Sequence, residues 1–239
     1  MNKYILAFTF LFVSFLSFNL SAQKVRGNGN IVSQNRNVGS FGKVHTYGSY
    51  DLVITDANEH KVTVEADENL QQYIIVETEG NTLKIRHQKG VNFNSSKQIL
   101  IHISAPMLSE VALSGSGNIK STNQLNGSDK FNISSSGSGN IEMDVETSDM
   151  SAAISGSGNI SLKGKTKQLD GRISGSGNIR AKNLQSEVTS VRISGSGSAE
   201  VVATQKLDTK IAGSGDVRYW GNASVDSKVA GSGSVSRQE

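Results

Sequence analysis

The sequence of 239 residues contains no cysteine, one proline and few aromatic residues, and each shortage excludes a class of protein. Without cysteine there is no disulfide scaffold, thiolate metal site, cysteine nucleophile or cysteine-linked lipid anchor. The lack of proline, and of glycine at every third position, excludes collagen. The 25 glycines would suit a flexible low-complexity chain, but such chains are usually rich in proline as well. The abundance of glycine therefore needs another explanation.

Residues Met1–Ala22 have the layout of a secretory signal peptide. Lys3 precedes the apolar run Tyr4–Phe18, and small residues follow up to Ala22. A membrane anchor is the alternative, but the apolar run is short for a membrane span. We therefore expect export to the periplasm, the outer-membrane surface or the extracellular space, with no transmembrane segment in the mature chain.

The charge of the chain argues against nucleic acid as a partner. The formal net charge is only +3. No cluster of lysine and arginine and no platform of aromatic residues supports nucleic-acid binding.

Most of the glycine belongs to a repeat. Gly-Ser-Gly occurs seven times, and successive copies lie 18 to 22 residues apart. The copies begin at Gly115, Gly137, Gly156, Gly175, Gly195, Gly213 and Gly231. A period near 20 residues is typical of a solenoid, in which each coil stacks on its neighbours.

Apolar residues recur at even distances from the first glycine of each copy, which predicts β-strands. Ile154, Ile173, Ile193 and Ile211 lie two residues before it, with Ser135 as an exception. We therefore predict an all-β, single-stranded β-helix with coils of about 18–22 residues and stacked Gly-Ser-Gly corners. Both glycines share the even phase, so we expect both to face inward where backbones approach closely, and a β-branched residue there to clash.

Outward positions predict two further columns of side chains. Asn118, Asn140, Asn159 and Asn178 should form an amide ladder along the solenoid, although a row of ligand-binding amides is the alternative. Asp208 and Lys210 should stack on Asp226 and Lys228, which places like charges one strand apart, relieved by the neighbouring opposite charges.

Residues 23–110 alternate in the same way but lack a clean Gly-Ser-Gly copy. We expect them to form irregular N-terminal β coils that continue into the regular repeats of residues 111–239 as one structural unit. The expected features are a degenerate copy at Gly48–Ile54, a short helix or loop at Asp67–Gln72, a tight turn at Gly80-Asn81 and a loop at Gly90–Lys97.

The sequence shows no catalytic, cofactor-binding or metal-binding motif. The four histidines, His45, His60, His87 and His102, lack metal-ligand spacing and are expected at the surface. No histidine follows His102 to activate the repeated serines, and the carboxylates of the repeats are scattered. We therefore expect no enzymatic activity. Trp220, which should point outward, is a candidate for sugar binding or a cover for a coil near the terminus.

The segments Ile154–Ile160 and Ile173–Ile179, both Ile-Ser-Gly-Ser-Gly-Asn-Ile, resemble the "putative auto-transporter adhesin, head GIN domain" family of exported bacterial proteins. Asp51–Gly90 is also similar to the N-terminal half of that family, and the resemblance covers about residues 27–235. It implies a β-helix related to pectate-lyase-like folds and a role in adhesion, and it implies no catalytic residues. Coils of 18 residues also allow a left-handed triangular helix, but the resemblance favours the right-handed form.

These observations predict an exported, non-enzymatic β-solenoid that acts as a cell-envelope or surface scaffold with an adhesion role. Its partner would be a protein or glycan on the cell surface. The open C-terminal coil, Val225–Val235, also suggests a homo-oligomer, because it exposes strand edges. The alternatives are a polysaccharide-active enzyme and a carbohydrate-binding module on the same fold.

Overall fold

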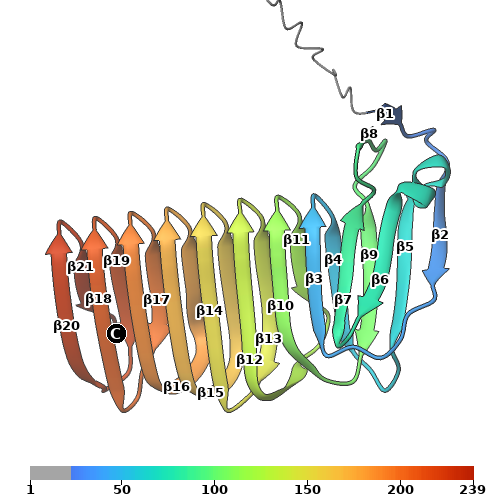
Figure 1. Cartoon of the computed structure of the whole chain (residues 1–239). Coiled ribbons are helices and arrows are strands. Elements are labelled where there is room, and N and C mark those ends of the chain that lie inside the picture. The colour runs from blue at the N-terminus through green and yellow to red at the C-terminus, as the bar shows by residue number, and fades with distance from the viewer. Residues whose placement is uncertain (1–22) are drawn as a thin grey trace, which may run out of the picture.

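The structure, a computed structural model, describes residues 23–239, so the predicted signal peptide lies outside the described residues. The chain forms a rod of stacked β coils, in which two walls of parallel strands face each other (Figure 1). The first wall consists of the strands that lead into each corner: β3 (Lys43–Gly48), β10 (Leu108–Gly115), β12 (Leu125–Gly137), β14 (Asp149–Gly156), the later parts of β15 (Asn159–Gly175) and β16 (Asn178–Gly195), β18 (Lys206–Gly213) and β20 (Ser224–Gly231).

The second wall consists of the strands that leave each corner. They are β4 (Asp51–Asp56), β11 (Asn118–Ser121), β13 (Asn140–Glu146), the earlier parts of β15 and β16, β17 (Ser198–Val202), β19 (Asp216–Trp220) and β21 (Ser234–Arg237). In Figure 1 the first wall ascends nearer the viewer, the second wall descends behind it, and successive coils advance from right to left. This path is a right-handed coil, as the resemblance implied.

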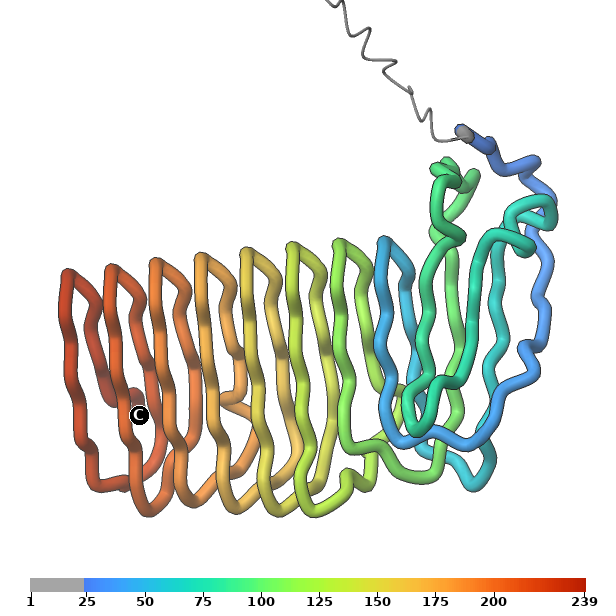
Figure 2. The backbone as a smooth tube through the Cα atoms, viewed as in Figure 1, coloured from blue at the N-terminus to red at the C-terminus, as the bar shows by residue number. Residues whose placement is uncertain are grey.

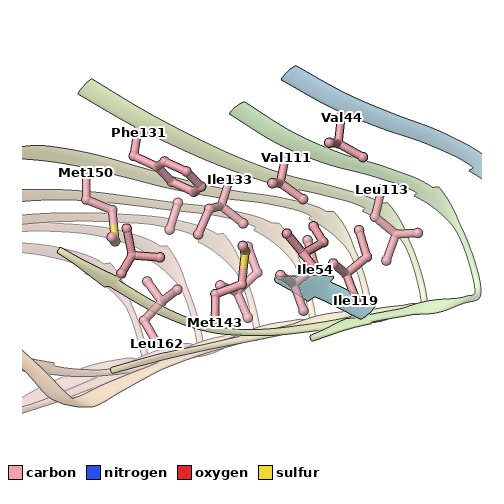
Figure 3. Close-up of a cluster of buried hydrophobic side chains, with 14 of the residues drawn as sticks. Val44, Ile54, Val111, Leu113, Ile119, Phe131, Ile133, Met143, Met150 and Leu162 are labelled. Carbon is pink, nitrogen blue, oxygen red and sulfur yellow. The ribbon is translucent and has the colours of Figure 1, made fainter. Parts of the chain in front are cut away.

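Neighbouring coils pair in the register that the repeat predicts. Gly156 lies opposite Gly175, which lies opposite Gly195, and the following asparagines align in the same way. Inward side chains of both walls fill the space between them, as Figure 3 shows for Phe131, Met143 and Met150. Because these inward positions are almost fully buried, the alternation seen in the sequence is the alternation between core and solvent.

The corners explain the glycine content. The first glycine of each copy has a positive φ, between +121° and +142°, which side chains disfavour. The Gly115 carbonyl oxygen accepts hydrogen bonds from the amides of Ser138 (3.1 Å) and Gly139 (3.2 Å) of the next coil, and four later corners repeat this arrangement. In the first six copies only the second glycine is buried, and the first is half-buried. A Cβ atom on either glycine would lie within 2.4 Å of a carbonyl oxygen of the preceding coil, so the expected close approach of backbones is confirmed for both, and the first glycine in addition turns the chain.

The N-terminal end differs from the predicted irregular coils, because antiparallel strands extend both walls. On the first wall, the hairpin of β6 (Ile74–Glu79) and β7 (Thr82–His87) pairs with β3 through β7. On the second wall, β9 (Leu100–Ala105) pairs with β4, and β5 (Lys61–Asp67) and β2 (Ile31–Arg36) follow in antiparallel order. The turn predicted at Gly80-Asn81 is confirmed.

Two further elements complete this end. The 3-10 helix η1 (Glu68–Tyr73) connects β5 to β6 and so crosses from the second wall to the first. It buries Leu70 completely. The segment predicted as a loop at Gly90–Lys97 contains β8 (Val91–Asn94), which pairs with β1 (Gln23–Arg26) and rises above the row of corners (Figure 2).

We predict that Gly177→Ala destabilises the protein by about 2 kcal/mol or more. A Cβ atom at Gly177 would lie 2.2 Å from the Gly158 carbonyl oxygen and 2.7 Å from Cγ2 of Ile154, so the backbone of the neighbouring coil would have to move. The matched control is Gly39→Ala, whose Cβ atom would have no neighbour closer than 4.0 Å. Denaturant unfolding measures both, and equal loss in the two variants would contradict the close approach at the corners.

Candidate functional site

The predicted asparagine ladder is confirmed. The side-chain amide of Asn140 donates to Oδ1 of Asn118 (3.0 Å), Asn159 donates to Asn140 (2.8 Å) and Asn178 donates to Asn159 (2.9 Å). At the N-terminal end the Asn118 amide donates to Oδ1 of Asp51 (2.9 Å). Because the amides bind one another, the column stabilises the stack of coils and is not a row of free ligand-binding groups.

The predicted charge columns lie on the outer face of the first wall. Asp208 pairs with Asp226 and Lys210 with Lys228, so like charges do stack. Arg172, Arg192, Lys210 and Lys228 line a shallow groove of about 480 Å³, beside a column of small residues that includes Ser174 and Ala212. Asp170 binds both Arg172 (2.5 Å) and Arg192 (3.2 Å), which partly neutralises the cationic side of the groove.

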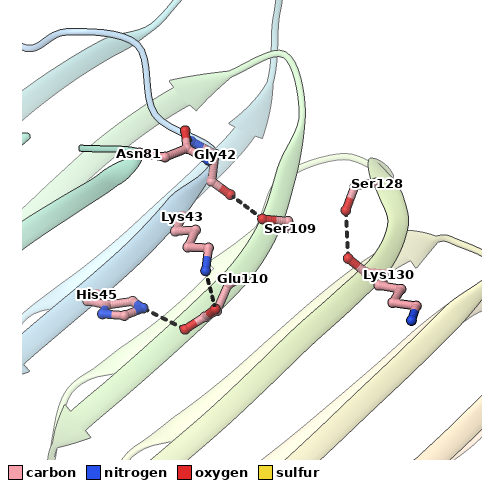
Figure 4. A network of polar contacts seen from close by, with 8 residues as sticks. All are labelled: Gly42, Lys43, His45, Asn81, Ser109, Glu110, Ser128 and Lys130. Carbon is pink, nitrogen blue, oxygen red and sulfur yellow. Dashed lines mark hydrogen bonds and ion pairs between the residues drawn. The ribbon is translucent and has the colours of Figure 1, made fainter. Parts of the chain in front are cut away.

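His45 belongs to a polar cluster near the N-terminal end of the rod (Figure 4). Glu110 contacts Nε2 of His45 at 2.7 Å and Nζ of Lys43 at 3.1 Å. Burial favours the neutral carboxyl group, but the hydrogen bonds and charges of Lys43 and His45 outweigh it and hold the pKa of Glu110 below its ordinary value. The arrangement is an ion pair between neighbouring strands.

The remaining histidines were also expected at the surface. His87 and His102 are exposed, as predicted, whereas His60, like His45, is half-buried. Within residues 23–239, no three histidine, aspartate or glutamate side chains lie close enough to hold a metal ion. Trp220 is half-buried at the end of β19 and lines neither the groove nor the pocket described below.

The repeat pattern breaks at the first corner, Gly48-Ser49-Tyr50. The degenerate copy predicted there is confirmed, because β3 and β4 pair in register with β10 and β11. Tyr50 takes the place of the second glycine and is buried. Burial raises the pKa of its hydroxyl, which has no hydrogen-bond partner among the described residues.

A longer connection replaces the corner that would precede Tyr50. Strands β7 and β9 pair with β3 and β4 as a preceding coil would, but residues 88–99 join them in place of Gly-Ser-Gly. Between this connection and the first corner lies a pocket of about 470 Å³. We call it the first-corner pocket; Ser49, Tyr50, His87, Asn92, Phe93 and Lys97 are among its lining residues.

The lining of the first-corner pocket combines rings with exposed polar groups. The rings of His87 and Phe93 meet edge to face, with centroids 6.2 Å apart. Asn92, Asn94 and Lys97 are exposed, and none of the lining residues is an aspartate or glutamate. The Gln98 side-chain amide donates to the Ser49 carbonyl oxygen (2.9 Å), which attaches the connection to the corner.

Asp67 holds the base of the same connection. Its buried carboxylate accepts hydrogen bonds from the hydroxyl of Ser95 (2.7 Å), the hydroxyl of Ser96 (2.6 Å), the amide of Ser96 (2.9 Å) and the amide of Gly29 (2.7 Å). Burial alone would raise the pKa of Asp67, but these four donors outweigh it and hold the pKa well below its ordinary value.

The residues of this site lie outside the repeats, and they were not predicted from the sequence. The one available signal was tyrosine in place of the second glycine.

Comparison with known proteins agrees with this architecture. The family model described as "Putative auto-transporter adhesin, head GIN domain" matches residues 40–223. A search among curated proteins finds no match. No helix within residues 23–239 is long and apolar enough to cross a membrane.

Several solved structures are similar to this chain along its whole described length. A "putative adhesin" from Bacteroides fragilis is 22% identical with a TM-score of 0.85, and the match covers 90% of this chain and 100% of the other. A "Putative lipid binding protein" from Parabacteroides distasonis is 26% identical with a TM-score of 0.77, covering 91% and 100%. A "putative adhesin" from Parabacteroides merdae is 24% identical with a TM-score of 0.72, covering 91% and 100%.

We predict that Asn118→Asp destabilises the protein more than Asn178→Asp. Each variant loses one amide donor, but a carboxylate at position 118 would also face the carboxylate of Asp51, whereas Asn178 donates to Asn159. The free energies of unfolding of the two variants should differ by about 1 kcal/mol at neutral pH. Repulsion between two carboxylates raises their pKa, so the difference should narrow as the pH falls and one of them is protonated. Thermal unfolding of both variants at several pH values measures this. If the difference in stability between them does not change with pH, the contact between residue 118 and Asp51 at the end of the ladder is contradicted.

We predict that Asp67→Asn loosens the connection over the first-corner pocket. An asparagine has one acceptor oxygen and cannot satisfy all four donors. Because the folded pKa lies below the ordinary value of about 3.9, the carboxylate stabilises the wild type above that pH and the effect is lost as the pH falls further. The protection factors of the amides of residues 27–30 and 91–98, which correct for the pH dependence of intrinsic exchange, should fall in the variant at neutral pH and in the wild type only on acidification.

The matched control for this change is Asp129→Asn, since Asp129 is exposed and lies outside this network. Exchange of the same segments that is equal in both variants would contradict the anchoring role of Asp67.

Proposed function

Because the chain belongs to the family described as "Putative auto-transporter adhesin, head GIN domain", we propose that it is an exported, non-enzymatic adhesin whose first-corner pocket binds a glycan. The signal-peptide layout of Met1–Ala22 supports export to the periplasm, the outer-membrane surface or the extracellular space. The rod then acts as a rigid cell-envelope or surface scaffold that carries the pocket at its N-terminal end.

The observation that carries the proposal is a polar and aromatic pocket at the one corner where the glycine pattern breaks. A volume of about 470 Å³ is suited to one or two sugar units. The side-chain amides of Asn92 and Asn94 can donate to and accept from sugar hydroxyl groups. The ring of Phe93 offers an apolar surface for the C–H face of a sugar, and Lys97 can pair with an acidic sugar.

The same lining argues for binding without hydrolysis. Hydrolysis of a glycosidic bond ordinarily needs two carboxyl groups that flank the bond, and the lining of this pocket contains none. A lyase would need an accessible base; burial removes the Tyr50 hydroxyl from that role, whereas His87 and Lys97 are exposed in the lining. The lining therefore argues against hydrolysis, and the mass of the oligosaccharides recovered in the experiment below tests the lyase alternative.

The experiment uses residues 23–239 on an array of neutral, uronic-acid-containing and sialylated oligosaccharides. We expect the wild type to retain a subset of them, and the double variant Asn92→Ala/Lys97→Ala to bind at least about tenfold more weakly, because each lost polar contact is worth about 1 kcal/mol. Both side chains are exposed, so the fold should survive the change. Recovered oligosaccharides should be unchanged in mass.

The control is Trp220→Ala, which removes the sugar-binding candidate that the sequence suggested but leaves the pocket intact. Retention that depends on Trp220 and not on the pocket residues would contradict the assignment of the site. Absence of retention on the whole array, or cleavage of the retained oligosaccharides, would contradict the function itself.

A further inference from the structure

The two ends of the rod are finished differently. At the N-terminal end, antiparallel strands and η1 complete both walls. At the other end, β20 pairs with β18 alone within residues 23–239, and all eight of its residues are exposed. Val225 and Val229, which occupy inward positions, are 39% and 43% exposed. β20 therefore presents a free row of backbone donors and acceptors together with uncovered apolar side chains.

The sequence of β20 is complementary to itself in the antiparallel direction. Reading outward from Ser227, Asp226 is matched by Lys228, and Val225 is matched by Val229. A second β20 turned by 180° about Ser227 would place each Asp226 opposite Lys228 of the other copy, on the outer face. It would also place each Val225 opposite Val229 of the other copy, on the inner face.

This arrangement relieves a repulsion present in the single chain. Within the chain, Asp226 stacks on Asp208 and Lys228 stacks on Lys210, so each charge has a like charge as its strand neighbour. Directly opposite like charges destabilise a sheet, and opposite charges stabilise it. A second copy supplies the opposite charge to both side chains at once.

We infer that the chain forms a two-fold symmetric dimer in which β20 pairs antiparallel with β20 of a second copy, centred on Ser227. A two-fold axis perpendicular to the walls joins first wall to first wall and brings β21 beside β21 of the other copy. The contact is isologous, so the assembly closes at two chains. The inference rests on β20 and is independent of the glycan pocket.

Head-to-tail stacking is the competing arrangement. The edge of the first wall at the other end is β6, whose outward residues include Glu77 and Glu79. These glutamates already pair with Arg86 and Lys84 of β7, so β6 has less need of the charges of β20 than a second β20 has. Such stacking would also continue without limit into filaments.

Sedimentation velocity on residues 23–239 tests the dimer through charge reversal. We expect a dimer for the wild type, and at least about a tenfold higher dissociation constant for Asp226→Lys and for Lys228→Asp, because each places two pairs of like charges across the axis. The double variant Asp226→Lys/Lys228→Asp should restore the dimer. Asp149→Lys, the same charge change on β14 away from the edge, is the control and should leave it unchanged.

Disulfide formation gives a second readout, which the absence of cysteine makes unambiguous. Opposed residues of antiparallel strands have Cα atoms about 4.5–5.5 Å apart, within reach of a disulfide. Ser227→Cys should therefore form covalent dimers on mild oxidation, whereas Ser224→Cys, three residues from the axis, should not. A wild type that stays monomeric at its highest soluble concentration, filaments, or a double variant that folds without recovering the dimer would overturn the inference.

Discussion

The close approach of backbones at the Gly-Ser-Gly corners is the constraint on which the rest of the rod depends. Each first glycine turns the chain through a positive φ, and at five of the seven corners its carbonyl oxygen accepts hydrogen bonds from two amides of the next coil. The second glycine leaves room for the carbonyl of the neighbouring coil and for an inward isoleucine. With the corner fixed in this way, the strands on both sides fall into register, and the aliphatic columns and the asparagine ladder follow from that register.

The same constraint explains why the first corner is different. Tyr50 can occupy the position of the second glycine only because no tight corner is stacked before it; residues 88–99 pass there instead. The departure from the repeat therefore creates space that the repeat itself cannot contain. Natural sequences often depart from their local rules at functional positions, and here the departure produces a pocket lined by groups absent from the corners.

The sequence predicted the parts of the structure that a local period determines. Even spacing predicted which isoleucines are buried, and equal offsets predicted that Asn159 binds Asn140 and that Asp226 stacks on Asp208. The antiparallel order of β2, β5 and β9 could not be predicted, because it depends on pairing between segments far apart in a region without a period. The network around Asp67 was missed for the same reason: its donors come from separate segments.

Each regular coil contributes its own corner and its own share of the core. Adding or removing one coil would change the length of the rod by one strand spacing, about 4.8 Å, and would leave the remaining coils as they are. The number of coils, marked by the seven Gly-Ser-Gly copies, therefore sets the distance from the first-corner pocket to β20. Evolution can therefore change the separation of the two ends by duplicating or deleting a repeat of about 20 residues, while the sequence of each end stays the same.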